Sequence, residues 1–259
     1  MLITYIGHSG FLVETEEIYL VFDCVAPIGS VSGEQMKFRA GTMPKLDGRK
    51  EIVVFVSHRH EDHYSHAIWQ LRKIYPHVKY VISKDVPFSP NVRKRLGLLE
   101  EDLHDILRAY GDQRYELKLY QGNKLQIETF YSTDEGVAYY LTLNGHTIYH
   151  AGDLHLWVWD EESAAYNKDM QNRFNRELEK LRGRKTDVAF LLLDPRQGKD
   201  AYRGMDAYLS AMNVTYAFPM HVWGKYEIIS DYMRARIEKP YISSLQKIER
   251  EGQVFDCTV

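Results

Sequence analysis

The 259-residue sequence has only two cysteines, Cys24 and Cys257, and they stand far apart without C-x-x-C spacing. This pattern excludes a disulfide framework and a thiolate metal site, since both need several cysteines at short spacings. No apolar run approaches the roughly 20 residues that a membrane helix needs, and no charged leader precedes an apolar stretch at the start. We therefore expect a cytoplasmic protein without a membrane partner.

A strong excess of charge of either sign is also missing. Thirty-three lysines and arginines stand against 36 aspartates and glutamates, which gives a formal net charge of −3. The field of such a protein does not attract a polyanion, so we expect a small-molecule substrate and no nucleic acid as its partner. The sequence leaves the oligomeric state open, including a homo-oligomer.

No Pro/Gly/Ser-rich or single-sign charged stretch is long enough to act as a linker, which predicts one domain over residues 1–259. An apolar hairpin that ends in an aspartate occurs twice, at 7–23 and at 131–153. Apart from chance resemblance, this repetition implies pseudo-duplicated halves of about 1–123 and 124–259. Two mixed sheets with helices outside would give a four-layer α/β/β/α sandwich and bring strand ends of both halves to one edge.

Hydrophobic periodicity and turn residues predict the individual elements. Strands are expected at 2–6, 11–14, 18–23, 52–56, 79–83, 115–120, 124–130, 137–143, 146–150, 188–193 and 215–219. Helices are expected at 65–75, 161–182 and 206–212. Residues 24–50 contain too many glycines and prolines for one regular element, and we expect a loop that covers a site.

Three histidines and one aspartate fall within six residues directly after the predicted strand 52–56, in the run His58-Arg59-His60-Glu61-Asp62-His63. A turn that leaves a strand at this spacing can aim two imidazoles at one point, and a carboxylate with an imidazole at a second. Zinc takes these ligand types readily, and iron and manganese also accept them. The run therefore predicts two neighbouring metal positions. The alternative is a polar histidine-rich loop without a metal.

The spacing His58-x-His60-x-Asp62-His63 resembles the signature of the metallo-β-lactamase superfamily. Downstream, Ile148–Asp153 resembles the segment whose aspartate bridges two metals, and Phe218–His221 resembles the one that supplies the last histidine. Upstream, 7–11 and 21–23 resemble the opening hairpin of the lactonase-like branch. The sequence as a whole resembles bacterial zinc-dependent hydrolases of the β-lactamase fold. The resemblance implies the α/β fold of this superfamily and the metal ligands His58, His60, Asp62, His63, Asp153 and His221.

One departure from the superfamily pattern concerns residues 129–136, where another histidine ligand is usual and this chain has none. The first metal position is therefore one ligand short, with His58, His60 and Asp153. The second is complete, with Asp62, His63, Asp153 and His221. Candidate substitutes are Asp134, the hydroxyls of Ser132 and Thr133, and His155, although such residues are more often found in turns or on the surface. One metal ion per chain, or weak loading, thus remains an alternative to two.

A bound metal ion lowers the pKa of its water to roughly 7, so a nucleophile becomes available at neutral pH. The sequence therefore predicts a metal-dependent hydrolase that uses metal-bound water on a small ester, lactone or phosphodiester, with zinc as the expected metal. Asp62 is the candidate for returning a proton to the leaving group, and His8 for contact with the substrate. The alternative is a metal-binding protein with an eroded site and little hydrolytic activity, retained for ligand sensing or structure.

The surroundings of these ligands also carry expectations. Asp23 and Asp194 end predicted strands and are expected to accept the second N–H of a ligand histidine. Trp157, Trp159 and Trp223 lie close in sequence to the proposed ligands and could wall a pocket, although tryptophans that merely pack are more common.

Overall fold

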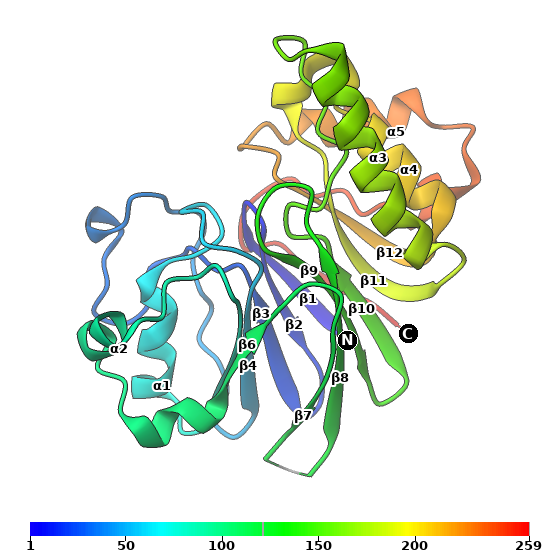
Figure 1. The fold of residues 1–259 in the computed structure, drawn as a ribbon. Coiled ribbons are helices and arrows are strands. Elements are labelled where there is room, and N and C mark those ends of the chain that lie inside the picture. Colours follow the sequence, from blue (N-terminus) through cyan, green and yellow to red (C-terminus); the bar gives the residue numbers. More distant parts are fainter. Residues whose placement is uncertain (121, 259) are drawn as a thin grey trace. The chain divides into compact units, whose positions relative to one another are not determined.

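The structure is a computed structural model that describes residues 1–120 and 122–258, and the chain divides into two compact units. Unit 1 comprises residues 1–110, 118–120, 122–123 and 251–258. Unit 2 comprises residues 111–117 and 124–250. Each unit combines a mixed β-sheet with helices (Figure 1).

In the described part of unit 1, seven strands form one sheet in the order β13-β1-β2-β3-β4-β5-β6. Neighbours from β13 to β3 are antiparallel, and those from β3 to β6 are parallel. The carboxyl ends of β3, β4 and β5 therefore lie at one edge. The strands are β1 (Leu2–Gly7), β2 (Gly10–Glu14), β3 (Ile18–Phe22), β4 (Glu51–Val56), β5 (Val78–Ser83), β6 (Ile106–Ala109) and β13 (Val254–Asp256).

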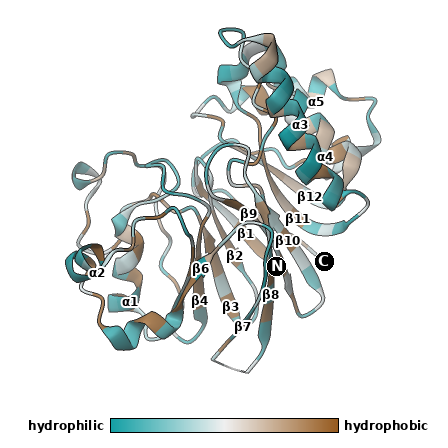
Figure 2. Ribbon diagram, viewed as in Figure 1, coloured by the Kyte–Doolittle hydropathy of each residue, from teal (hydrophilic) through white to brown (hydrophobic). Residues whose placement is uncertain are grey.

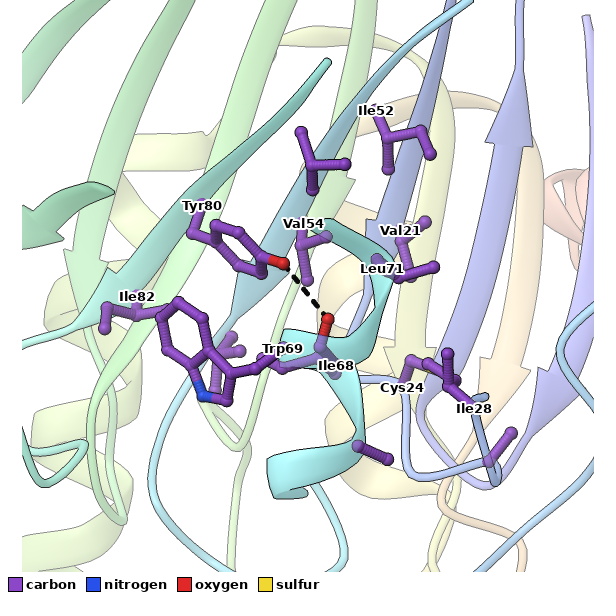
Figure 3. Close-up of a cluster of buried hydrophobic side chains, with 14 of the residues drawn as sticks. Val21, Cys24, Ile28, Ile52, Val54, Ile68, Trp69, Leu71, Tyr80 and Ile82 are labelled. Carbon is purple, nitrogen blue, oxygen red and sulfur yellow. Dashed lines mark hydrogen bonds between the residues drawn. The ribbon is translucent and has the colours of Figure 1, made fainter. Parts of the chain in front are cut away.

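Apolar side chains of this sheet pack against the segment that follows the His-rich run (Figure 3). The ring of Trp69 stacks on Tyr80 with centroids 4.3 Å apart, and the Tyr80 hydroxyl donates to the Ile68 carbonyl at 3.1 Å. Such an aromatic pair contributes about 1 kcal/mol beyond its buried area, which fixes this segment on the sheet. The helical elements of unit 1 are η1 (Gly33–Gln35), η2 (His66–Gln70), α1 (Leu71–Ile74), α2 (Pro90–Leu96) and η3 (Glu100–Asp105).

In the described part of unit 2, six strands form a sheet in the order β12-β11-β10-β9-β8-β7. Strands β8 to β10 pair antiparallel and β10 to β12 pair parallel. The turn Asn144-Gly145 has φ of 50° and 84°, as a two-residue hairpin of type I′ requires. The strands are β7 (Arg114–Lys118), β8 (Lys124–Tyr131), β9 (Val137–Leu143), β10 (His146–His150), β11 (Lys185–Leu192) and β12 (Asn213–Met220).

The helices of unit 2 are amphipathic and bury one face. In α3 the buried residues include Met170, Phe174 and Leu178, and Phe174 meets Tyr208 of α4 edge to face at 5.3 Å. The hydrophobic colours of Figure 2 follow the strands, whereas α3 is hydrophilic over much of its length. The helical elements are α3 (Ala164–Leu181), η4 (Pro195–Asp200), α4 (Arg203–Ala211), α5 (Glu227–Ala235) and η5 (Pro240–Ser244).

The two sheets share one pairing order. Strands β1 to β5 and strands β8 to β12 each run antiparallel, antiparallel, parallel, parallel along the chain. Each of the two hairpins that the sequence analysis singled out supplies the second and third strands of one such series, β2-β3 and β9-β10. The prediction of a single domain with duplicated halves stays a prediction.

The expected strands all occur, with ends that shift by a few residues. The expected helix at 65–75 is instead a 3₁₀ turn followed by one α-turn, and the helix expected at 161–182 begins only at Ala164, where Ser163 caps it. Among the α-helices and strands of the described residues, α2, β6, α5 and β13 were missed, and the 3₁₀ turns η1, η3, η4 and η5 were not predicted either. The Ser89-Pro90 start and the Gly97 stop of α2 are recognisable helix boundaries. In contrast, β13 has three residues and forms only by pairing with β1.

Two further findings bear on the sequence expectations. None of the helices in residues 1–120 and 122–258 is both long and apolar enough to cross a membrane. Both cysteines are free and buried, and burial raises the pKa of the Cys24 thiol to about 12 and that of Cys257 to about 11. Both thiols are therefore protonated at neutral pH.

Candidate metal centre

The His-rich run begins one residue after β4, at the carboxyl edge of the unit 1 sheet. His58 and His63 are fully buried, His60 and Asp62 are partly buried, and Arg59 and Glu61 are exposed. The backbone N–H groups of His63 and Tyr64 donate to the His60 carbonyl at 3.0 and 2.8 Å. This tight turn folds the run back on itself, so residues adjacent in sequence present their side chains at two neighbouring points.

The donor atoms of unit 1 form two groups. Nε2 of His58 lies 3.0 Å from Nδ1 of His60, close to the roughly 3.4 Å expected for two nitrogens that share a tetrahedral ion. His8, Asp62 and His63 each offer a ligand atom within 4.8 Å of the others. The expected ligands of the His-rich run thus come together within unit 1, and His8 joins them.

A buried carboxylate orients one of these imidazoles. Oδ2 of Asp23 lies 2.8 Å from Nδ1 of His63, and the Ser57 backbone N–H donates to Oδ1 at 2.7 Å. The Ser57 hydroxyl donates to Asp23 Oδ2 and also lies 2.9 Å from Nδ1 of His58. An Nδ1–H that donates to a carboxylate leaves the Nε2 lone pair for a metal ion. Asp23 therefore accepts from a ligand histidine, as the sequence analysis expected. No sequence pattern pointed to the contact of Ser57 with both residues.

The position of His8 depends on a close approach of backbone segments. His8 has φ of 54°, and its Nε2 lies 3.2 Å from Oδ2 of Asp62. A Cβ on Gly41 would stand 1.7 Å from the Ile6 carbonyl oxygen, so only glycine lets the 24–50 loop lie against the end of β1. The Phe38 ring of that loop packs edge-on against His8 at 5.0 Å.

A cavity of about 400 Å³ lies in unit 1 beside the His-rich run. The 24–50 loop supplies part of its wall, including Met36 and Phe38, and the exposed side of the run supplies Arg59 and Glu61. Apolar lining with a few charged groups is typical of small-molecule sites of this size.

In unit 2 the candidate ligands follow the ends of β8, β10 and β12, which lie at one edge of the sheet. Asp134 and Asp153 offer carboxylate oxygens within 4.8 Å of each other. Nε2 of His221 lies 3.7 Å from Oδ1 of Asp153. Asp153 is 5% exposed and His221 1%, whereas Asp134 is exposed.

Asp194 holds His221 as Asp23 holds His63. Its Oδ2 lies 2.8 Å from Nδ1 of His221 and accepts from Nη2 of Arg196 at 2.6 Å and from the Trp223 indole N–H at 3.3 Å. Burial alone would raise the pKa of Asp194, but the hydrogen bonds from His221 and Arg196 outweigh it and lower the pKa. The carboxylate is therefore ionised while it orients the imidazole.

Of the two candidates that carry a carboxylate or an imidazole, Asp134 has a ligand atom within 4.8 Å of one of Asp153, whereas His155 does not belong to this group within the described residues. The Thr133 hydroxyl is bound to the backbone of His155, and the Ser132 hydroxyl accepts from the Asp134 N–H. His155 is fully buried, and its Nε2 lies 2.8 Å from Oε1 of Gln197. Burial lowers the pKa of His155 to about 4, which marks it as a neutral core histidine.

The donor set fits a metal ion in each unit taken separately. Imidazoles held at Nδ1 by buried carboxylates, together with further carboxylates nearby, form the environment that zinc, iron or manganese takes in proteins. That the ligands of both units share one metal centre stays a prediction.

Comparison with known proteins agrees with these features. A family model described as β-lactamase superfamily domain matches residues 2–169. Among solved structures, the chain is 18% identical to Igni18, a metallo hydrolase from the hyperthermophilic archaeon Ignicoccus hospitalis, with a TM-score of 0.59 and 98% of both chains covered. It is 13% identical to the metallo-β-lactamase fold protein YhfI from Bacillus subtilis, with a TM-score of 0.52 over 98% of this chain and 99% of that one.

A third similar structure is isothiocyanate hydrolase from Delia radicum gut bacteria, which is 15% identical, with a TM-score of 0.51 and 99% of both chains covered. At these identities the likeness concerns the fold. Comparison with curated proteins by sequence found no match.

Proposed function

This chain belongs to the metallo-β-lactamase superfamily and is a metal-dependent hydrolase, and we propose that it hydrolyses a small ester, lactone or phosphodiester. The predicted fold class, the α/β fold of this superfamily, is confirmed by the family match and by the two mixed sheets with helices. The observation that carries the proposal is that each unit has a histidine fixed at Nδ1 by a buried aspartate. Assignment to the lactonase-like branch remains part of the proposal.

We propose a metal centre with two positions, to which both units contribute. In the proposal, Asp134 would take the place of the missing histidine beside Asp153, and Asp153 would serve as a ligand in both positions. The closeness of donor atoms inside each unit supports this assignment. The combination of ligands from both units in one centre rests on the superfamily pattern. The first position has the ligands His58, His60, Asp134 and Asp153, and the second has Asp62, His63, Asp153 and His221.

Bound metal ions would lower the pKa of water and polarise the carbonyl or phosphoryl oxygen of the substrate. The residues supply orientation and proton transfer. Asp23 and Asp194 keep the Nε2 lone pairs of His63 and His221 available, since each accepts from Nδ1. Asp62 Oδ2 can carry a proton to the leaving group, and His8 Nε2 lies 3.2 Å from the same oxygen and can replace that proton.

Zinc is the metal that we propose first. In the first position a carboxylate replaces an imidazole. Carboxylate oxygens suit harder metal ions than imidazole nitrogens do, so manganese or iron is the alternative at this position. The net charge of −3 supports a small-molecule substrate without a nucleic acid, and we propose a cytoplasmic location.

The absence of a histidine from residues 129–136 is the reason for considering a second function. In that case the chain would be a metal-binding protein with an eroded site and little hydrolytic activity. Asp134 argues against erosion because a carboxylate oxygen stands within 4.8 Å of a ligand atom of Asp153. A site that lost a ligand without replacement would have no such donor.

Metal analysis and a substrate panel test the proposal together. Protein purified without chelator is analysed for zinc, manganese and iron, and hydrolysis of a lactone, a p-nitrophenyl ester and bis-p-nitrophenyl phosphate is measured with and without added zinc or manganese. We expect one to two metal ions per chain and metal-stimulated hydrolysis of at least one substrate, which His63→Ala abolishes. The matched control is His104→Ala, since the side chain of His104 is 71% exposed. Protein that binds metal but hydrolyses nothing in the panel would support the second function.

A further inference from the structure

Three of the four tryptophans in the chain gather around His221 in unit 2. The rings of Trp157 and Trp223 lie 5.9 and 5.4 Å from the His221 ring, and both meet it edge to face. Trp159 stacks on Trp157 at 5.8 Å with 7° between the ring planes. Trp157 is buried, whereas Trp159 and Trp223 are partly exposed. Aromatic surface therefore remains accessible close to a candidate metal ligand.

Arg196 lies over two of these rings. Its guanidinium carbon is 4.3 Å from the centroid of Trp223 and 5.9 Å from that of Trp159. Cation–π contact with tryptophan is the strongest of its kind and holds the guanidinium plane in one orientation. The side chain is nevertheless 46% exposed, so a solute can reach it.

One edge of this guanidinium is engaged and the other is available. Nε and Nη2 of Arg196 both donate to the carboxylate of Asp194, at 2.6 to 3.0 Å. Within the part of the chain that the structure describes, Nη1 donates to no protein group. A guanidinium has five N–H donors in a rigid fork, and two of them belong to Nη1.

The same carboxylate connects this arginine to the candidate metal ligand. Oδ2 of Asp194 contacts Nη2 of Arg196 at 2.6 Å and Nδ1 of His221 at 2.8 Å. An acceptor bound to Nη1 would therefore lie on the Nδ1 side of His221, beyond Asp194, which is a place for a substituent on a substrate rather than for the reacting group.

We propose that Arg196, Trp159 and Trp223 bind an oxyanion on the substrate, such as a carboxylate, sulfonate or phosphate, together with a flat apolar group attached to it. This inference rests on the proposed function, because it places the anionic end of the hydrolysed molecule beside His221. The fixed Nη1 edge receives the oxyanion as a charge-assisted hydrogen bond, and the exposed part of the Trp159 and Trp223 rings receives the apolar group.

The test measures binding of benzenesulfonate to the metal-loaded protein by calorimetry, with tryptophan fluorescence as a second readout. Benzenesulfonate is a poor metal ligand, so its binding reports on the arginine rather than on the metal. Methyl phenyl sulfone serves as the neutral probe of similar shape. We expect benzenesulfonate to bind more tightly than the sulfone, and Arg196→Gln to raise the Kd of benzenesulfonate at least tenfold while leaving that of the sulfone unchanged.

Arg203→Gln is the matched control. Arg203 also pairs with an aspartate, Asp200 at 3.1 Å, and has a nearly equal exposure of 44%. Because Arg196→Gln removes a partner of Asp194, metal content and melting temperature are measured for every variant. Arg196→Lys keeps the charge beside Asp194 but loses the planar fork, so we expect a Kd for benzenesulfonate about threefold higher with metal content unchanged.

Equal Kd values for benzenesulfonate in wild type, Arg196→Gln and Arg196→Lys would overturn the inference, as would the absence of binding to the wild type. The proposed function fails separately. If the protein binds benzenesulfonate through Arg196 but hydrolyses no substrate, the oxyanion site is supported and the proposed hydrolysis is refuted. If the protein hydrolyses a substrate but does not bind benzenesulfonate, only the oxyanion site is refuted.

Discussion

Nδ1 of His63 lies 2.8 Å from Oδ2 of Asp23, and both side chains are almost completely buried. The two residues are 40 positions apart and meet because β3 and β4 are parallel neighbours, so that the residues after Phe22 and Val56 lie side by side. A carboxylate in this position fixes the imidazole ring and raises its basicity as a ligand.

Asp23→Asn should weaken metal binding in consequence. An asparagine keeps the size of the side chain but loses the charge that favours donation from Nδ1, so we expect metal affinity to fall 10- to 100-fold. Competition with a chromogenic chelator measures the change. Asp47→Asn is the control, because Asp47 pairs with the exposed Arg49 before the start of β4, whereas the His-rich run follows the end of β4. Equal metal affinity in Asp23→Asn and wild type would contradict a ligand role for His63.

Asp134→Ala should cost the protein about one metal equivalent under limiting zinc. The first metal position then keeps three protein ligands and no replacement for the missing histidine, whereas the second keeps four. Asp134→His should restore tight binding of zinc. Metal content after mild chelation distinguishes the variants, and Asp160→Ala, in an exposed pair with Lys199, is the control. If Asp134→Ala retains as much metal as the control, the substitute ligand lies elsewhere.

Gly41→Ala should destabilise the protein more than Gly97→Ala. Both glycines have a left-handed φ, of 73° and 69°, so either alanine costs about 1 to 2 kcal/mol in backbone strain. A Cβ at residue 41 additionally stands 1.7 Å from the Ile6 carbonyl oxygen, whereas one at residue 97 meets nothing within 4 Å. Urea denaturation compares the free energies of unfolding. Equal losses in the free energy of unfolding would mean that the 24–50 loop moves away from Ile6 at no cost in free energy.

Asp206→Asn should lower stability in a pH-dependent manner. Burial raises the pKa of Asp206, but hydrogen bonds from Arg236, Tyr241 and Tyr232 outweigh it and lower the pKa. A depressed carboxyl pKa contributes stability above the unfolded value near 4, and that contribution is lost as the pH falls through the folded pKa.

We therefore expect Asp206→Asn to reduce the free energy of unfolding by about 1 to 3 kcal/mol at pH 7, and by progressively less toward pH 3. Urea denaturation at several pH values measures the difference. The control is Asp231→Asn, whose carboxylate pairs with Arg234 on the exposed side of α5 and is 48% exposed. A deficit that stays constant down to pH 3 would show that Asp206 stabilises the fold by packing rather than by charge.

The sequence predicted the elements whose pattern is local. The apolar run before His58, the Asn144-Gly145 turn and the spacing of α3 each depend on residues within a few positions of one another, and each is present. The His-rich run belongs to the same class, since one tight turn after a strand suffices to gather its side chains. No comparable local signal exists for β13, because three residues form a strand only when β1 is there to pair with them.

The choice among residues distant in sequence was left to the tertiary structure. The candidates for the missing ligand were equal as long as only residue types were known, namely Asp134, Ser132, Thr133 and His155. Folding engages the Thr133 hydroxyl with backbone and buries His155 against Gln197, and leaves the Asp134 carboxylate near Asp153. The contact of Arg196 with Trp223 likewise depends on how η4 and the residues after β12 pack together. Chemical type and spacing are properties of the sequence, whereas the folded structure decides which of these donors lies close to Asp153 and which are buried against other groups.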